Sequence, residues 1–540
     1  MAAEQWLDRF ALADPTQESS LRSIYGVDRD IILERVNLFG TVLATFCHAF
    51  GARQPVFLVR CPSRVNWEGH HVDHQGGSYN ATTQAREFVA ACSERQDGWV
   101  IVHNAESLRF RPCRFRVDDL SPQHHRSGGW ERFVIGAWIA LKERFPTLVF
   151  HGVNLALGSD IPTGGGMSSS HALLVTSLLA AATANRLTLQ RSEIVSLIQR
   201  ADWLAGSRTG LGDQATMLFG RRGFLFHSPV GTADEISPEY IPLPDGYALM
   251  IADSLTHHTL AGQEAVAYNS RVFACRLALP LLLQGFAALG IDETTIASLR
   301  CPADISPQKV PLELIYQGLG AIPSDLRLDE ARLRFQEACV SGLTSLSFDE
   351  LVETYFPSGE RPDTVPVRGV LMYTLAECRR SVLFAQHLLE GNISEAGRLM
   401  NAGHEGDRVS RANPETGEYT NAEYPVTDIL LKDLLDDLRS QEPNRTDRAQ
   451  LQYQHGDYRA STPTLDQMVD IARTHGAVGA SLTGGGHGGV MIALMQEDRC
   501  DGFREAMCFF HRERSCLSED QASRTVQKCV TVEGAGMISI

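Results

Sequence analysis

A run of three glycines followed by three serines restricts what this part of the chain can form. A strand-like segment at 153–157 and a turn at 158–162 precede the glycines, and an apolar segment at 172–184 follows the serines. That last segment is rich in leucine and alanine and contains no glycine or proline, so we expect a buried helix. Strand, glycine turn and buried helix together predict an α/β or α+β arrangement.

The glycine–serine turn has the properties of a phosphate-binding loop. Its unshielded N–H groups would face the positive end of a helix dipole, with hydroxyls available for metal or oxygen contacts. It is not a Walker A sequence, because no Lys-Ser/Thr pair follows the glycines, and it lacks the spacing of a dinucleotide fingerprint. The alternative is a flexible turn that caps a helix and binds nothing.

Size and charge limit the class of protein. The 540 residues predict roughly two to four domains. A formal net charge of −16 argues against nucleic acid or an anionic membrane as the partner. We expect no segment long and apolar enough to cross a bilayer, and a cytoplasmic location, because the N-terminus lacks a basic segment followed by an apolar one. The twelve cysteines include no C-x-x-C pair, which argues against a zinc ribbon.

The pattern of apolar and turn residues predicts two sets of elements. The first set comprises a helix at 28–50, strands at 56–59, 87–92, 99–102 and 110–117, and a helix at 130–145. The second set comprises strands at 247–253 and 490–494 and helices at 371–389 and 427–438, the last with Thr427 as its N-cap. Two segments rich in proline and turn residues, around 285–367 and 409–456, have the appearance of insertions.

The segment 64–77 places a guanidinium, two carboxylates and three imidazoles within fourteen positions. Such a group could orient the hydroxyls of a sugar, because carboxylates accept hydrogen bonds and imidazoles donate or accept them. It could also bind a metal, since its histidines and Asp73 are suitable ligand types, or it could be a solvated loop.

Two further positions could take part in chemistry. Asp213, in the run Gly-Leu-Gly-Asp-Gln, could cap a helix, or its carboxylate could position a hydroxyl and take its proton. A second glycine cluster at 484–489 could form a tight hairpin, or its glycines could let the backbone approach another surface closely.

Taken in order, these segments resemble the GHMP small-molecule kinases, and among them the galactokinase branch. Residues 64–77 are similar to the sugar-binding signature R-V-N-L-I-G-E-H-T-D-Y-N-G-G, and residues 162–173 to the nucleotide loop P-x-G-x-G-L-S-S-S-A-x-L. Residues 210–214 are similar to G-I-M-D-Q, and residues 482–489 to M-T-G-G-G-F-G-G. The first fifty residues and the two insertion-like segments lie outside the resemblance.

The resemblance implies a two-domain α/β (α+β) fold of the GHMP-kinase type. It would consist of a helical extension at 1–50, an N-terminal mixed-sheet domain for nucleotide and sugar at 51–240, and a C-terminal ferredoxin-like α+β domain at 241–540 with helical insertions. It also implies transfer of the γ-phosphate of ATP to the anomeric hydroxyl of a sugar, in a cleft between the domains, with Mg²⁺ as cofactor. It leaves the oligomeric state open.

The resemblance also implies roles for individual residues. Asp213 falls on the catalytic aspartate, and Arg64 falls on the partner that stabilises this carboxylate and the developing charge. The other roles fall into three groups: sugar contacts by His70, His71, Asp73 and Tyr268; phosphate contacts by Gly164, Gly165, Gly166, Ser168, Ser169 and Ser170; and Mg²⁺ contacts by Ser169 and Asp202.

One departure from the family pattern bears on the sugar. His70 stands where galactokinases carry a glutamate that touches the C6 hydroxyl. Exchange of an anionic acceptor for a potential cation favours a sugar with a carboxylate at C6, or one that lacks this carbon. Residues 73–77 read D-H-Q-G-G, as in kinases of galacturonate. Galactose, galacturonate and related sugars are therefore all candidate acceptors.

Further departures suggest other hypotheses. Asp202 is shorter than the acidic residue of the family and lies one position out of register, and His171 replaces a small residue beside the phosphate loop. These changes motivate a second hypothesis, a sugar- and ATP-binding sensor that keeps the fold but has little turnover. A metal hydrolase built on the histidines at 70–74 is a third.

Overall fold

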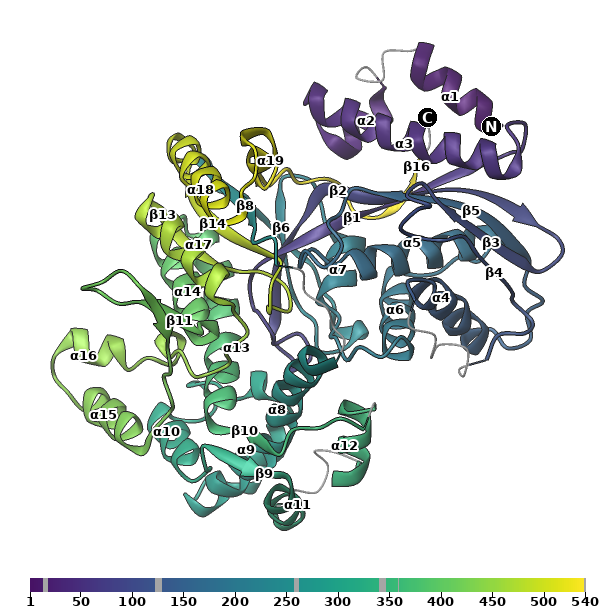
Figure 1. Ribbon diagram of the computed structural model, residues 1–540. Coiled ribbons are helices and arrows are strands. Elements are labelled where there is room, and N and C mark those ends of the chain that lie inside the picture. The colour runs from purple at the N-terminus through teal and green to yellow at the C-terminus, as the bar shows by residue number, and fades with distance from the viewer. Residues whose placement is uncertain (13–17, 122–128, 257–261, 339–345, 358, 539–540) are drawn as a thin grey trace.

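The computed structural model describes residues 1–12, 18–121, 129–256, 262–338, 346–357 and 359–538. These residues form two packed units, each built on its own sheet (Figure 1). The first sheet comprises β1 (Phe57–Glu68), β2 (Ser78–Arg95), β3 (Trp99–Asn104), β4 (Cys113–Arg116), β5 (Gly152–Ser159), β6 (Phe224–Pro229), β7 (Glu239–Pro242) and β16 (Gly536–Ile538). Its order is β16-β1-β2-β5-β3-β4, and β6 joins β2 to β7.

Helices cover both faces of this sheet. They are α1 (Ala3–Leu12), α2 (Ser19–Tyr25), α3 (Arg29–Phe50), α4 (Glu131–Arg144), α5 (Ser169–Ala184), α6 (Arg191–Leu204) and α7 (Gly212–Phe219). Successive residues of a strand point to opposite faces. Leu58 accordingly lies in the core formed with α1–α3, and Val59 lies in the core formed with α4–α7. Figure 1 shows α1–α3 on one side of the sheet and α4–α6 on the other.

The predicted helices of the first unit are confirmed. Asp28 caps α3, because its carboxylate accepts hydrogen bonds from the N–H groups of Asp30 and Ile31. Most of the predicted strands were too short, whereas the one predicted at 110–117 is only Cys113–Arg116. Strand β1 was expected at 56–59 but continues to Glu68, because the polar residues from Ser63 onward are buried beneath the second unit instead of facing solvent. Arg64 therefore lies on a strand and not in a loop.

The second sheet contains β8 (Tyr247–Asp253), β13 (Ala477–Leu482), β14 (Val490–Gln496) and β15 (Val526–Lys528). All its pairings are antiparallel, in the order β13-β14-β8-β15. Numbered along the chain, this order is 2-3-1-4, which is the ferredoxin-like arrangement and confirms that prediction.

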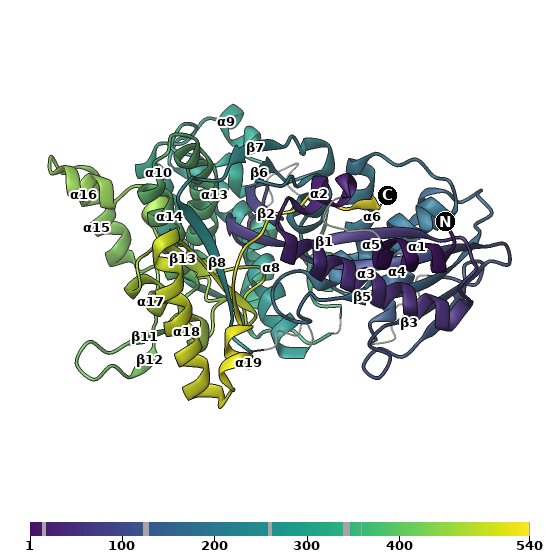
Figure 2. The same cartoon turned by 90° about the horizontal axis from the view of Figure 1, so that it is seen from above.

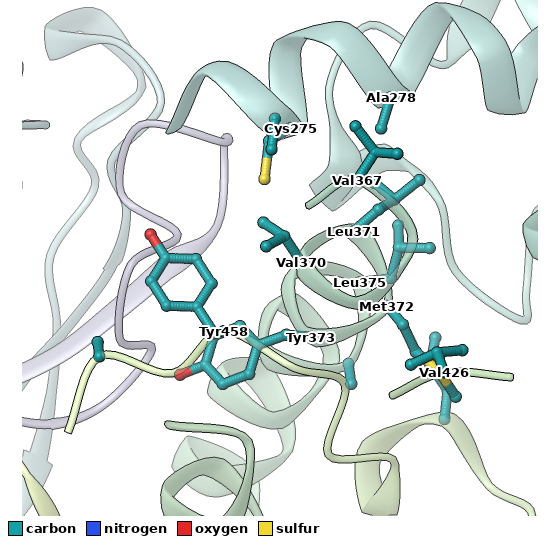
Figure 3. Packing of buried hydrophobic residues seen from close by; sticks show 14 of the residues in the cluster. Cys275, Ala278, Val367, Val370, Leu371, Met372, Tyr373, Leu375, Val426 and Tyr458 are labelled. Carbon is teal, nitrogen blue, oxygen red and sulfur yellow. The ribbon is translucent and has the colours of Figure 1, made fainter. Parts of the chain in front are cut away.

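Helices pack against this sheet and against one another. The main ones are α8 (Gly262–Ala288), α13 (Arg368–Leu389), α14 (Ile393–Asp407), α17 (Pro463–Thr474) and α18 (Cys500–Ser515). Figure 3 shows Cys275 and Ala278 of α8 close to Val370 and Leu371 of α13, in the core of this unit. The predicted N-cap of the helix at 428–438 is also confirmed, since Thr427 accepts a hydrogen bond from the N–H of Leu430.

The insertion-like segments form small helices and hairpins at the outside of the second unit. These are α9 (Glu293–Ser298), α10 (Leu312–Gly320), β9 (Asp325–Arg327), α11 (Leu328–Glu337), α12 (Phe348–Tyr355), β10 (Thr364–Pro366), β11 (Ser410–Ala412), β12 (Tyr419–Asn421), α15 (Asp428–Leu438) and α16 (Pro443–Arg448), while α19 (Glu519–Ser523) follows α18. Figure 2 shows α15, α16 and the β11–β12 hairpin at the end of the molecule far from α1.

Two expectations differ from the structure. Strand β16 pairs with β1 in the first sheet, although the division at 241–540 assigns it to the second unit. By length and composition, α3 and residues 266–288 of α8 are apolar enough to cross a membrane, so the expectation of no such segment was wrong. In the structure α8 is largely buried and α3 packs one face on the sheet, and core helices also pass this test.

Candidate functional site

A cavity of about 620 Å³ lies where the two units meet. Residues of β1, β2, α5 and α7 line it from the first unit, and Tyr268 of α8 lines it from the second. Gly164, Gly166, Gly484 and Gly485 also line it, so both glycine clusters face the same space.

The two glycine clusters pack directly against each other. A Cβ atom on Gly484 would lie 2.5 Å from the carbonyl oxygen of Gly166, and one on Gly489 would lie 2.8 Å from the carbonyl carbon of Gly165. Side chains at these positions would therefore push the two loops apart. The second cluster is both the turn between antiparallel β13 and β14 and a site of close backbone approach.

Five of the six residues predicted to contact phosphate line the cavity. They are Gly164, Gly166, Ser168, Ser169 and Ser170. Gly165 is not among the lining residues, and its N–H donates to the carbonyl of Pro162. Ser168 has a left-handed backbone (φ 58°) at the start of α5, so the chain reverses there and brings the serines to the helix N-terminus. Their contact with phosphate stays a prediction.

Arg64 and Asp213 come together at the centre of this cavity. The guanidinium binds the carboxylate through two hydrogen bonds, Nε to Oδ1 at 2.6 Å and Nη2 to Oδ2 at 2.9 Å. The remaining nitrogen, Nη1, donates to the carbonyl of Gly166 at 2.7 Å. One planar side chain on β1 therefore connects the phosphate loop to the first turn of α7.

Further donors surround the Asp213 carboxylate. The Tyr79 hydroxyl donates to Oδ1 at 2.8 Å, and the Ser168 hydroxyl donates to Oδ2. Burial alone would raise the pKa of Asp213, but Arg64, His171 and the Ser168 bond together hold this pKa below its ordinary value. The carboxylate is therefore ionised at neutral pH.

Three of the four predicted sugar contacts line the cavity. These are His71, Asp73 and Tyr268. The His71 ring stacks on Tyr458 with centroids 4.3 Å apart, and its Nε2 lies 3.4 Å from Asp407 Oδ1. Figure 3 shows Tyr458 beside Tyr373, whose hydroxyl also binds Asp407.

His70, the fourth predicted sugar contact, is not among the residues that line the cavity. Its backbone N–H and that of Gly69 both donate to Glu377 Oε1, at 2.7 and 2.9 Å, and these bonds fix the turn. The His70 ring is buried against Asn66 and Ser481. Burial lowers its pKa from 6.5 to about 4, so the ring is neutral at physiological pH. The expected cationic contact with a C6 carboxylate therefore has no basis in this geometry.

Replacement of His70 by asparagine is expected to make stability less sensitive to acid. The unfolded chain binds a proton at His70 near pH 6.5, and the folded chain does so only near pH 4, so the folded state loses stability as the pH falls through this window. The His70 contribution to this loss reaches about 2 kcal/mol at pH 5. Urea unfolding of the wild type and His70→Asn at pH 7 and pH 5 measures the difference.

His475, exposed at the end of α17, provides the control substitution. His475→Asn should leave the wild-type loss of stability between the two pH values unchanged. If His70→Asn behaves in the same way as this control, the His70 ring is not held neutral by burial.

Comparisons with known proteins agree with this site. Residues 132–221 match the GHMP kinases N-terminal domain, and residues 430–513 match the GHMP kinases C-terminal domain. Residues 44–94, which include the predicted sugar contacts of the first unit, match the galactokinase galactose-binding signature. The chain contains both GHMP kinase domains. The C-terminal match begins inside the segment 409–456, so the second half of that segment is not outside the family's domain as predicted.

Similar proteins extend the comparison over most of the chain. A galactokinase from Dictyostelium discoideum is 26% identical over 86% of this chain and 85% of its own length. One from Chloroflexus aggregans is 25% identical over 92% of this chain and 96% of its own length. The crystal structure of Lactococcus lactis galactokinase complexed with galactose superposes with a TM-score of 0.60 at 19% identity, covering 91% of this chain and 98% of that one, which confirms the two-domain fold.

The cavity has an aromatic wall that the sequence analysis missed. Phe110, Trp130 and Phe133 line it, with Arg109 over Phe110 and Arg132 over Phe133 at 5.1 and 4.8 Å from the ring centroids. Phe110 and Trp130 meet edge to face. The alternation of arginine and aromatic residues at 109–110 and 132–133 is the signal that could have indicated it.

Asn66 was also missed, although it lies two residues from Arg64. It lines the cavity, and among the described residues its Oδ1 has no hydrogen-bond partner. Its amide nitrogen is held by the carbonyl of Gly69 and lies 3.3 Å from His70 Nδ1. A buried acceptor of this kind normally has a partner, so a ligand hydroxyl is expected to supply it.

Only one of the two residues predicted to hold Mg²⁺ lines the cavity. Ser169 lines the cavity, but Asp202, 1% exposed at the end of α6, is not among its lining residues. Asp202 Oδ2 accepts a hydrogen bond from Thr209 at 2.6 Å and lies 4.0 Å from His171 Nε2. Among the described residues, no three His, Cys, Asp or Glu side chains are grouped so that they could hold a metal ion. The histidines at 70–74 thus give no support to a metal hydrolase.

Proposed function

We propose that this chain transfers the γ-phosphoryl group of ATP to the anomeric hydroxyl of galactose or a closely related neutral sugar. The proposal depends on the pair of hydrogen bonds between Arg64 and Asp213. These bonds lie beside the glycine–serine loop, inside a cavity that both units line. The galactose-binding signature at 44–94 and the galactokinase relatives support the class of sugar.

The site suits a reaction with a loose transition state. The sugar oxygen forms a bond to the γ-phosphorus, the bond from that phosphorus to the β–γ bridging oxygen breaks, and ADP leaves. In such a reaction the hydroxyl proton departs late, so the low pKa of Asp213 is compatible with its role. The carboxylate would orient the hydroxyl and accept its proton as the phosphoryl group transfers.

Arg64 contributes charge and geometry. It keeps Asp213 ionised, and its bond to the Gly166 carbonyl fixes the carboxylate relative to the loop that would hold the phosphates. Its position near the transferring group would also stabilise negative charge there. The N–H groups and hydroxyls at the start of α5 would bind phosphate oxygens, and the aromatic wall at 110, 130 and 133 offers flat surfaces for the adenine ring.

The charges near Asn66, His71 and Tyr268 favour a neutral sugar over a uronate. Around Asn66, His71 and Tyr268 the cavity presents the carboxylates of Asp73 and Asp213. Arg64 is already bound to Asp213 and Gly166, and the neutral His70 ring lies outside the lining. A C6 carboxylate would meet like charge there, whereas a C6 hydroxyl could donate to a free acceptor such as Asn66 Oδ1.

A sugar panel tests the proposal. ADP release with galactose, galacturonate, arabinose, glucose and glucuronate should show the highest kcat/KM for galactose, with galacturonate lower by about 10²-fold or more. Equal or faster turnover of galacturonate would contradict the neutral-sugar preference. Binding of galactose and ATP, seen by calorimetry, without any ADP release would instead select the sensor that the sequence also suggested.

A further inference from the structure

His171 lies between two carboxylates at the edge of the cavity. It occupies the first turn of α5 and is 3% exposed. Its Nδ1 lies 3.5 Å from Asp213 Oδ2, and its Nε2 lies 3.2 Å from the Thr209 hydroxyl oxygen. That hydroxyl in turn donates to Asp202 Oδ2 at 2.6 Å. These contacts connect four side chains in one continuous series. The side chains come from α5, α6, α7 and the segment between α6 and α7.

The positions of the hydrogen atoms in this series of contacts follow from the bond between Thr209 and Asp202. A threonine hydroxyl has one hydrogen, and Thr209 gives it to Asp202. Thr209 must therefore accept a hydrogen from His171 Nε2. The other ring nitrogen, Nδ1, faces the ionised Asp213 at 3.5 Å from its Oδ2. Asp202 therefore sets the direction of the Thr209 hydroxyl, and this hydroxyl sets the orientation of the imidazole.

We infer that Asp202, Thr209 and His171 form a positioning relay for the Asp213 carboxylate. Tyr79 and Arg64 hold Oδ1, and Arg64, Ser168 and the relay hold Oδ2, the oxygen beside the phosphate loop. In this arrangement Asp202 acts on the reaction through Thr209 and His171 and does not ligate a metal. The inference rests on the phosphoryl transfer proposed above.

The relay explains two departures from the family pattern together. His171 fills the space of a small residue beside the loop, and Asp202 is shorter than the acidic residue expected near it. The shorter carboxylate does not line the cavity, and the imidazole and Thr209 span the distance to Asp213 instead. The competing role for Asp202 is metal ligation, since its Oδ1 has no hydrogen-bond partner among the described residues.

Thr209→Val tests the relay with little change in shape. Loss of the hydroxyl frees the imidazole, so kcat with galactose and ATP is expected to fall about tenfold. The KM values for both substrates should change little, because the wild-type volume is kept. Thr209→Ser retains the hydroxyl and should restore most of the wild-type kcat.

A double-mutant cycle separates the relay from independent effects. His171→Ala should lower kcat at least as much as Thr209→Val, and adding Thr209→Val to it should change kcat by less than about twofold. If Thr209→Val keeps the wild-type kcat, or if the two losses multiply, the relay is wrong. Turnover of galactose by the wild type in the same assay would still support the proposed function.

Metal binding tests the competing role of Asp202. Mn²⁺ titration of the ADP-bound protein, followed by EPR, should give the same dissociation constant for the wild type and Asp202→Asn within about twofold. A loss of affinity of tenfold or more in Asp202→Asn would identify Asp202 as a metal ligand and overturn the inference.

Discussion

Asp213→Asn is expected to lower kcat by at least about 10³-fold while galactose still binds. The amide has the shape of the carboxylate but no charge, so it can neither take the hydroxyl proton nor accept every hydrogen bond that Arg64, Tyr79 and Ser168 donate. ADP release measures the rate, and calorimetric titration with galactose measures binding. Retention of most of the wild-type kcat would show that Asp213 does not carry the chemistry.

The control removes a similar carboxylate elsewhere. Asp470 on α17 binds Arg408 through two hydrogen bonds, at 2.7 and 3.0 Å, and is not among the lining residues of the cavity. Asp470→Asn should lower thermal stability and leave kcat near the wild-type value. The comparison therefore distinguishes the general effect of losing an arginine-paired carboxylate from the specific effect of losing Asp213 in the cavity.

Arg64→Lys is expected to lower kcat by about 10²-fold and to destabilise the protein by about 2 kcal/mol. Lysine keeps the charge but cannot make the two parallel bonds to Asp213 together with the bond to Gly166. Kinetics with galactose and ATP and urea unfolding at pH 7 measure the two effects. Arg200 pairs with Glu143 in the same two-bond geometry but is 49% exposed, so Arg200→Lys should change neither quantity appreciably.

Arg64→Lys should also change how the stability of the folded protein depends on pH. The folded-state pKa of Asp213 is lowered, so its contribution to stability is present above the ordinary aspartate pKa of about 4 and is lost as the pH falls below it. Without the paired guanidinium the pKa of Asp213 rises toward the unfolded value. Arg64→Lys should therefore lose less stability than the wild type between pH 5 and pH 3, and an equal loss would contradict this account.

Periodicity and turn residues were enough to predict much of the fold. Helix α3, the strand that precedes the phosphate loop and α5 were all indicated by local patterns. Only the beginning of strand β1 was indicated, because Arg64 and Glu68 are polar yet buried beneath a second unit whose residues come much later in the sequence. The preferences of individual residues for helix or strand give no information about a contact with such a distant part of the sequence.

The candidate site was only partly accessible from the sequence. Arg64 and Asp213 are 149 positions apart, and resemblance to a family rather than spacing indicated that they meet. The displacement of His70 from the cavity depends on Glu377, 307 positions away, which no local motif indicates. The sequence also did not indicate the connection from Asp202 to His171, because the residues around Thr209 form no recognisable motif.

The pairing of β16 with β1 has a consequence for the order in which the protein matures during synthesis. β1, the strand that presents Arg64, is translated early, but its neighbour on one side is contributed by residues 536–538. A nascent chain that has left the ribosome only as far as residue 240 therefore lacks part of its first sheet. Completion of the sheet that presents Arg64 must wait until residues 536–538 have emerged.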